Sequence, residues 1–292
     1  MYVRAQEFRD SLIPNITGEV LEIGPGQIAF PTPFAKNLIL VDKLPSELHK
    51  QLFPELGQDI SIVEPDYLVD LDSEKLKIFS DETFDCVVAS HMLEHLAQPF
   101  RMLDEIYRVL KPGASVIIFL PDRRRTFDKS RICQSFEHFA QEYLLGNDEV
   151  SDYDLDDYLT EVENYKFSNR DEEFVQLHLA RSIHVHAWTD EEFVHLLEQM
   201  TSIAQFRFKI IKAISSSRHT NLEEFGLVLE KNLESAHINI SLDWEKSIVN
   251  EVEKYDFKLR NTKSSLVKTL KKLLPVRFKI LVKKLWNREL TT

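Results

Sequence analysis

The chain has 292 residues, 43% of them hydrophobic and 29% charged, so it can bury one large core, or a core with an appendage. Its only two cysteines, Cys86 and Cys133, exclude a disulfide framework and suit a reducing cytoplasm. The first residues contain no apolar signal segment, and no run reaches the roughly 18 apolar residues of a membrane span. These features predict a cytoplasmic protein.

The net charge of −12 is unevenly distributed along the chain. Positions 263–292 hold nine Lys or Arg and a single Glu, so the rest of the chain is strongly acidic. An acidic body repels phosphate backbones, which argues against a nucleic-acid partner. The basic tail spaces its leucines as an amphipathic helix does. We expect it to lie peripherally on the inner membrane surface, to dock on the acidic body or to mediate self-association.

Short apolar runs alternate with a helical pattern in the first part of the chain, which is typical of a βαβ architecture. A helix is predicted over 99–110, where the apolar residues fall on one face, and the sequence KPG at 111–113 should end it. The strands are nearly continuously apolar, as in a parallel sheet covered by helices on both faces. We predict an α/β fold with a Rossmann-like, doubly wound sheet. The predicted strands are 20–23, 38–41, 60–63, 84–89 and 115–120.

The alternation stops after the fifth strand. Positions 123–185 are polar, acidic and aromatic-rich, and predict an inserted, largely helical substrate lid. A helix restarts at Thr189, which forms a capping box with Glu192. Two β-like runs, 206–214 and 225–229, suit an antiparallel pair that closes the sheet. The predicted domains are a core of residues 1–122 and 186–232, the inserted lid 123–185, and a basic amphipathic helical tail 233–292.

The first strand runs directly into a glycine turn, in the sequence VLEIGPGQ at positions 20–27. Gly24, Pro25 and Gly26 allow a sharp reversal and let a ligand approach the backbone without interference from a Cβ atom. The third glycine of the dinucleotide motif G-x-G-x-x-G is absent, which weakens a pyrophosphate-binding interpretation. Glu22 instead suits a ligand with an ammonium group, such as the methionine part of S-adenosylmethionine (SAM).

Further motifs follow in order. Asp42 ends the second strand, where its carboxylate could accept both ribose hydroxyls or simply cap the strand. The sequences FDCVVASHMLEHL at 84–96 and RVLKPGA at 108–114 come next. Together with the glycine turn, these motifs resemble the methyltransferase-11-like branch of class I SAM-dependent methyltransferases, with Ala114 in place of that branch's second glycine. The resemblance covers roughly residues 18–122.

The resemblance implies a class I methyltransferase fold, SAM-dependent methyl transfer, and SAM as the cofactor. It places the glycine turn at the methionine and sulfonium part of SAM and Asp42 at the ribose. Asp70 would contact the adenine amino group, with Asp72 as its rival. The positions follow the carboxyl ends of parallel strands, where ligands bind in open α/β sheets. The implied cofactor residues are Glu22, Gly24, Pro25, Gly26, Asp42, Asp70, Leu71, Ser90 and His91.

Histidines gather near the end of the insertion, in the sequence SIHVHAW at 182–188. In a strand, His184 and His186 would point to one face, and a histidine can remove a proton from a substrate hydroxyl. These two are the predicted catalytic residues, and the alternative is that they only pack or hydrogen-bond. His138 is a weaker candidate for the same role at the substrate site.

Arg123, Arg124 and Arg125 follow the fifth strand and could bind a phosphate, a carboxylate or a sugar diphosphate. Alternatively, they anchor the insertion through salt bridges. The segments PDRRRTFDK at 121–129 and HVHAWT at 184–189 also look similar to methyltransferases encoded beside bacterial glycosyltransferases. That similarity implies a hydroxyl of a saccharide or surface-polymer precursor as the acceptor. The alternatives are a small-metabolite or lipid N- or O-methyltransferase, and a non-catalytic SAM-binding scaffold.

No metal is predicted. His91 and His95 stand four positions apart, as metal ligands on a helix can. Met92, however, stands where the zinc motif H-E-x-x-H requires Glu, so a structural or pocket-lining role is favoured.

Overall fold

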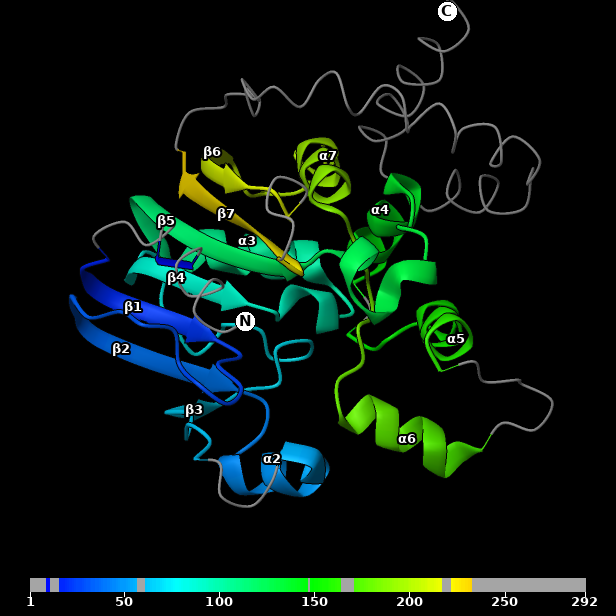
Figure 1. The fold of residues 1–292 in the computed structure, drawn as a ribbon. Coiled ribbons are helices and arrows are strands. Elements are labelled where there is room, and N and C mark those ends of the chain that lie inside the picture. The colour runs from blue at the N-terminus through cyan, green and yellow to red at the C-terminus, as the bar shows by residue number, and fades with distance from the viewer. Residues whose placement is uncertain are drawn as a thin grey trace, which may run out of the picture. The chain divides into compact units, whose positions relative to one another are not determined.

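A seven-stranded mixed sheet organises the part of the chain that the structure, a computed structural model, describes: residues 9–10, 16–56, 61–146, 148–163, 171–216 and 222–232. The strand order is β3-β2-β1-β4-β5-β7-β6, and Figure 1 shows the strands side by side. This architecture is the Rossmann-like α/β fold that the sequence predicts. The strands are β1 (Gly18–Ile23), β2 (Ala35–Asp42), β3 (Tyr67–Leu68), β4 (Phe84–Ser90), β5 (Leu110–Pro121), β6 (Phe208–Ile214) and β7 (Glu224–Lys231).

The order in which the strands pair determines where the site lies. β1 pairs in parallel with both β2 and β4, so the chain crosses from one side of β1 to the other between these strands. Such a switch point opens a crevice at the carboxyl ends of the strands. β7 lies antiparallel between β5 and β6, which confirms the predicted antiparallel pair at the end of the sheet.

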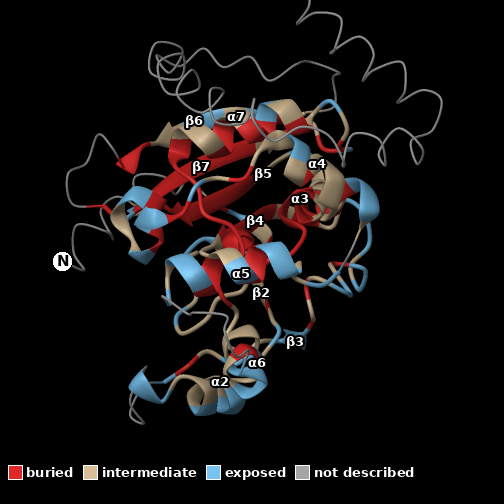
Figure 2. Ribbon diagram, turned by 90° about the vertical axis from the view of Figure 1, so that its right-hand side faces the viewer, coloured by how far each residue is buried: buried red, intermediate tan, exposed pale blue. Residues whose placement is uncertain are grey.

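The sheet is buried because its strands are apolar on both faces. In β4, Val87, Val88 and Ala89 are fully buried, and in β5 the run from Val116 to Leu120 is fully buried. Figure 2 shows this burial as red along β4, β5 and β7, while α5 and α6 carry pale blue outer faces. Continuous burial of this kind fits strands covered on both faces.

Helices cover the sheet and form the insertion. The predicted helix over 99–110 is confirmed as α3, and the capping box of Thr189 and Glu192 begins α7 as expected. Figure 1 shows the arrowheads of β1, β2 and β4 pointing toward the side on which α5 and α6 lie. The α-helices are α2 (Ser46–Leu52), α3 (Pro99–Val109), α4 (Phe136–Leu145), α5 (Asp152–Glu161), α6 (Glu172–Ala180) and α7 (Asp190–Met200). Four short 3-10 helices span Pro54–Leu56, Leu93–His95, Arg123–Arg125 and Phe127–Ser130.

The predicted strand at 60–63 was wrong. Residues 61–63 form no strand, and the third strand is the two-residue β3 a few positions later; Ile60 lies outside the described residues. Ile62 in this run is buried, and the Val63 N–H donates to the Gln27 carbonyl oxygen at 3.2 Å. The segment therefore bonds to the glycine turn through its backbone and not to a neighbouring strand.

The sequence KPG at 111–113 ends α3 but lies within β5, which begins at Leu110 opposite Phe84. The register shifts between this pair and Cys86, whose partner is Ser115. The extra residues therefore form a bulge in the strand, with Gly113 at a φ of +74°.

The predicted tail, 233–292, lies outside the described residues. Among the residues that are described, no helix is long and apolar enough to cross a membrane. Three helices, α4 to α6, occupy the predicted insertion, and its role as a lid remains a prediction.

Candidate functional site

The glycine turn after β1 is built for close approach. Gly24 and Gly26 have φ values of +64° and +58°, in the left-handed region that glycine adopts without strain. A Cβ atom on Gly24 would come within 3.0 Å of the Met92 side chain, whereas one on Gly26 would meet nothing within 4 Å. Position 24 thus requires glycine because the Met92 side chain is close, whereas Gly26 borders open space that a ligand could fill. The turn fits the cofactor that the sequence implies.

Asp42 stands beside that space at the end of β2. One of its carboxylate oxygens accepts a long hydrogen bond of 3.4 Å from the Gly26 N–H, and the other accepts one of 3.2 Å from the Leu44 N–H. A carboxylate offers about four acceptor positions. Asp42 therefore has capacity left for the two hydroxyls of a ribose.

Glu22 has a different environment from the one that sequence reasoning foresaw. Its side chain is buried, and its two oxygens accept from the Phe30 N–H at 2.9 and 2.8 Å. Burial raises the pKa of Glu22 to about 7. Glu22 thus fixes the loop that follows the glycine turn, and its contact with an ammonium group stays a prediction.

Both candidates for the adenine contact lie after β3. Asp70 forms an ion pair with Lys43 at 2.9 Å, whereas Asp72 accepts from the Ala97 N–H at 2.9 Å. Burial raises the pKa of Asp72 to about 6. Leu71 between them is buried. The structure places both carboxylates at the same loop and leaves the choice between them open.

His91 follows Ser90, the last residue of β4, and lies at the same end of the sheet. It is one of four non-glycine residues with positive φ among the described residues, at +51°. Its Nε2 lies 2.5 Å from a carboxylate oxygen of Glu224, which also pairs with Arg9 at 2.9 Å. The sequence analysis missed both partners, because they lie far from the motifs in the chain.

A group of four side chains, which we call the His184 cluster, continues the crevice beyond His91: Glu94, His95, Asp128 and His184. The His184 Nδ1 lies 2.6 Å from a carboxylate oxygen of Asp128, and the His95 Nδ1 lies 3.0 Å from the Ile183 carbonyl oxygen. The rings of His95 and His184 pack edge to face with centroids 4.8 Å apart.

Glu94 is the unusual member of the cluster. It is fully buried, yet neither carboxylate oxygen has a hydrogen-bond partner among the described residues. Its Oε1 lies 4.0 Å from the His95 Nε2 and 3.6 Å from the His91 Nδ1. Through Glu94, the His184 cluster adjoins the cofactor side of the crevice.

Arg131, which sequence reasoning did not single out, supports the cluster from behind. It is nearly fully buried, pairs with Asp128 at 3.0 Å, and donates to the carbonyl oxygens of His184 and Val185. Burial alone would raise the pKa of Asp128, but hydrogen bonds and charges from His184 and Arg131 hold this pKa below its usual value. Asp128 is therefore an anion that orients the His184 ring.

His186 does not join His184, because residues 182–187 are irregular and not a strand. It belongs to a second group, the His186 cluster: His138, Glu142, Asp154 and His186. The His186 ring is fully buried against Phe139, at a centroid distance of 4.9 Å, and burial lowers its pKa to about 4.

His138 is held between two carboxylates in that cluster. Its Nε2 lies 3.1 Å from Glu142 and 3.2 Å from Asp154. Burial would lower the pKa of His138, but these two partners raise it to about 9. At neutral pH His138 is a paired imidazolium that links α4 to α5, which is a structural arrangement.

The arginines after β5 face α7. Arg123 donates two bonds to Glu192, and Arg124 pairs with Asp122 and Asp190, both at 2.6 Å. These contacts match the anchoring alternative for Arg123 and Arg124. Their carboxylate partners lie outside the insertion, but Arg123 also donates to the Arg131 carbonyl oxygen inside it, at 2.9 Å. Arg125 completes the same short 3-10 helix.

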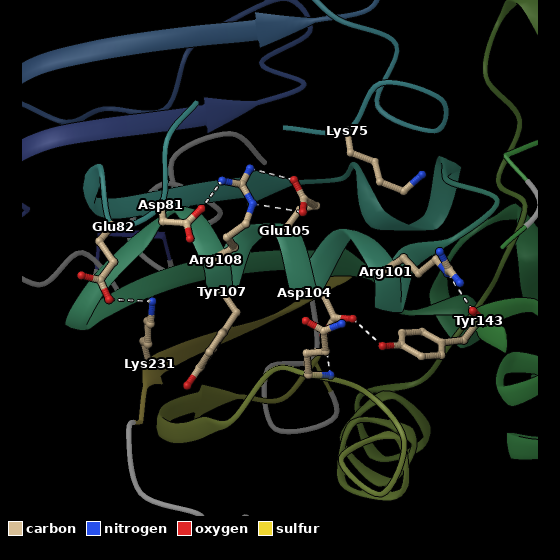
Figure 3. Close-up of a pocket in the computed structure, with 11 residues that line it drawn as sticks. Lys75, Asp81, Glu82, Arg101, Asp104, Glu105, Tyr107, Arg108, Tyr143 and Lys231 are labelled. Carbon is tan, nitrogen blue, oxygen red and sulfur yellow. Dashed lines mark hydrogen bonds and ion pairs between the residues drawn. The ribbon is translucent and has the colours of Figure 1, made fainter. Parts of the chain in front are cut away.

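A groove of about 450 Å³ runs along α3, on residues that the sequence analysis did not select. Figure 3 shows Arg108 pointing to Asp81 and Glu105, and Asp104 pointing to Tyr143. Its charged side chains have partners within the groove, except Lys75, which pairs with Asp148 outside it, and it contains none of the predicted site residues. We therefore place the candidate site in the crevice at the strand ends.

Comparison with known proteins finds similarity in the N-terminal half of the chain. Residues 21–118 match the family model described as a methyltransferase domain. The chain is 32% identical over 111 residues to the ubiquinone/menaquinone biosynthesis C-methyltransferase UbiE of Haemophilus ducreyi, over 37% of this chain and 42% of that protein. The chain thus spans less than half the length of this curated relative.

Solved methyltransferase structures are also similar. Phosphoethanolamine N-methyltransferase 1 of Haemonchus contortus, in complex with phosphoethanolamine and S-adenosylhomocysteine, has a TM-score of 0.47 at 14% identity, over 91% of this chain and 53% of that one. A possible histamine N-methyltransferase of Thermotoga maritima has a TM-score of 0.43 at 17% identity, over 79% and 89%. The sequence match shows that residues 21–118 are similar to a methyltransferase domain, and it supports SAM as the cofactor.

Proposed function

We propose that the protein transfers the methyl group of SAM to an oxygen nucleophile, a hydroxyl of a saccharide or surface-polymer precursor. The observation that carries this proposal is the pair of His184 and Asp128, with Nδ1 and carboxylate oxygen 2.6 Å apart. A carboxylate on Nδ1 fixes the tautomer and the ring, and leaves Nε2 for chemistry. The pair adjoins the crevice that holds the glycine turn and His91.

The chemistry supplied by SAM is an electrophilic methyl group on a sulfonium ion. Methyl transfer from it requires mainly alignment and exclusion of water. Asp42 and the glycine turn would bind and orient the cofactor. The His184 cluster would promote loss of the proton from the acceptor hydroxyl, and the helices α4 to α6 would shield the crevice.

The saccharide acceptor is supported by the two segments that look similar to methyltransferases encoded beside glycosyltransferases. Asp128 comes from the first segment and His184 from the second, and the two side chains are in direct contact. The segments therefore build one site, although 56 positions separate the two residues. The acidic charge of the body favours such an acceptor over a nucleic acid.

A carbon acceptor is the second candidate, because the curated relative is a C-methyltransferase by name. A small metabolite or lipid methylated on nitrogen or oxygen, and a SAM-binding scaffold without turnover, complete the alternatives. Purified protein with isotope-labelled SAM and a panel of nucleotide sugars, lipid-linked saccharides and quinone precursors separates them. Label on a sugar oxygen supports the proposal, whereas label only on carbon, nitrogen or lipid overturns the saccharide assignment.

The proposed binding of the cofactor is tested by calorimetric titration with S-adenosylhomocysteine. We expect Asp42→Ala to weaken binding roughly 100-fold, because a hydrogen bond to a charged group contributes about 1.5–3 kcal/mol. Asp156→Ala, at an exposed carboxylate of α5, is the matched control and should bind as the wild type does. If S-adenosylhomocysteine does not bind to the folded wild-type protein, both the methyltransferase proposal and the SAM-binding scaffold alternative are refuted.

A further inference from the structure

The His184 cluster contains a feature that proton transfer by one histidine does not require. One ligand atom each from Glu94, His95 and His184 lies within 4.8 Å of the other two. Ligands around one metal ion stand about 3–4 Å apart, since bonds to imidazole nitrogen and carboxylate oxygen are about 2.0–2.2 Å long. The 4.0 Å between the Glu94 Oε1 and the His95 Nε2 falls in this range.

Both histidines are held as metal ligands usually are. The Nδ1 of His184 is bound by Asp128, and the Nδ1 of His95 by the Ile183 carbonyl oxygen. In metal sites the second ring nitrogen nearly always donates to a carboxylate or a backbone carbonyl, which fixes the ring. Each ring therefore has its Nε2 left for a ligand bond.

Glu94 supplies a second, independent observation. A fully buried carboxylate without a hydrogen-bond partner is costly, because burial removes its hydration. A cation beside it would compensate that cost. The His95 and His184 side chains remain 28% and 13% exposed, so solvent reaches both rings.

We propose that Glu94, His95 and His184 bind one divalent transition-metal cation of the Zn²⁺ type, which leaves a fourth position open toward the crevice. Two histidines and one carboxylate are a ligand set of catalytic zinc sites, and imidazole favours zinc over magnesium or calcium. This inference rests on the proposed function and deepens it, because it names what removes the acceptor proton. The cation would bind the acceptor hydroxyl oxygen and lower its pKa. The O–H bond breaks with its proton passing to solvent, and the O–CH₃ bond forms as the S–CH₃ bond breaks.

The His186 cluster also brings possible ligands together, as His138, Glu142 and His186. The distances there also fit ligands of one ion, since the His138 Nε2 lies 3.1 Å from Glu142 and 3.2 Å from Asp154. His186 is, however, fully buried, so an ion there would have no open position. The two clusters thus serve as internal controls for each other.

The test is metal binding by the full chain, stripped with a chelator and titrated with Zn²⁺ alone. We expect about one ion per chain, with affinity at least about 100-fold weaker in His184→Ala and in the near-isosteric Glu94→Gln. Asp128→Asn should weaken binding about 10–100-fold, through the orientation of His184. His138→Gln, from the other cluster, and His195→Ala, on α7, should bind as the wild type does.

Replacement by Co²⁺ gives a second readout, because visible absorption reports ligands directly and a structural role of these residues would not produce it. Circular dichroism checks that each variant is folded. Folded wild type that binds less than about 0.1 ion per chain overturns the inference. So does Zn²⁺ binding that disappears in His138→Gln and persists in Glu94→Gln.

Methyl transfer separates this inference from the proposed function. If the stripped protein methylates its acceptor at the full rate, the metal site is wrong and the methyltransferase proposal stands. If the protein binds Zn²⁺ as expected but methylates no acceptor, the site stands and the proposed function is wrong.

Discussion

Two histidine-carboxylate clusters share one irregular segment, which contributes His184 to the first and His186 to the second, and they have opposite properties. In the His184 cluster, the Nδ1 of each histidine is held by an oxygen partner, and both rings remain partly exposed. In the His186 cluster, His138 is neutralised by two carboxylates and His186 is sealed among aromatic rings. On the proposed function, the same residue types would serve reactivity in one place and packing in the other.

The difference teaches which property marks a reactive histidine. Residue type and spacing are nearly identical for His184 and His186, which stand two positions apart. What separates them is whether a ring nitrogen is both oriented and accessible. A carboxylate supplies the orientation for His184, whereas full burial removes access from His186.

The largest effect should come from His184→Ala. Loss of the group that handles the acceptor proton should lower the rate of methyl transfer by about 10²–10⁴-fold, with binding of S-adenosylhomocysteine unchanged. A rate assay with labelled SAM and calorimetry on the same preparation measure both quantities. His195→Ala is the control, and an equal loss in that variant would contradict a specific role for His184.

His186 should affect stability and leave the chemistry intact. His186→Ala removes a fully buried ring and should cost about 2–4 kcal/mol of unfolding free energy. His186→Phe should change it by less than about 1 kcal/mol, because neither ring nitrogen has a hydrogen-bond partner to lose. Urea unfolding measures both. Methyl transfer lost in a stable His186→Phe would place His186 in the reactive cluster after all.

The smallest effect concerns pH. His138 faces Glu142 on its own helix, and Asp154, Tyr153 and His186 from elsewhere. Its pKa is raised from 6.5 to about 9, so its stabilising contribution is complete below pH 6.5 and is lost as pH rises through about 9. Partial exposure reduces the effect to about 1–2 kcal/mol.

Thermal melting of wild type and His138→Gln between pH 6 and 10 measures that contribution. The wild type should melt roughly 2–8 °C higher than the variant at pH 6, and the two should converge at pH 10. A gap that stays constant over this range would mean that His138 is not a paired imidazolium.

The cofactor half of the site was largely predictable from sequence. The glycine turn, Asp42 and Ser90 with His91 each follow a strand directly, so a local pattern and the rule for strand ends place them together. The strand predicted at 60–63 failed because the apolar segment there bonds to the glycine turn through its backbone, and periodicity does not distinguish that from a buried strand.

The acceptor half was only partly predictable. His184 was found from its local cluster of histidines, but its partners Asp128, Glu94 and His95 lie between 56 and 90 positions earlier in the chain. Sequence reasoning considered metal ligands only as two histidines on one helix. The ligand set proposed above joins Glu94 and His95 to a histidine from a distant loop, which local spacing does not indicate.

The contact between His91 and Glu224 has a consequence for how this chain is made. His91 directly follows β4, and Glu224 begins β7, 133 positions later. A ribosome adding about 5–20 residues per second needs roughly 7–27 s to cover that interval. During this time the nascent chain holds the glycine turn, Asp42 and His91 without the carboxylate that pairs with His91. A chain stalled or truncated before β7 therefore lacks the contact that holds the His91 ring.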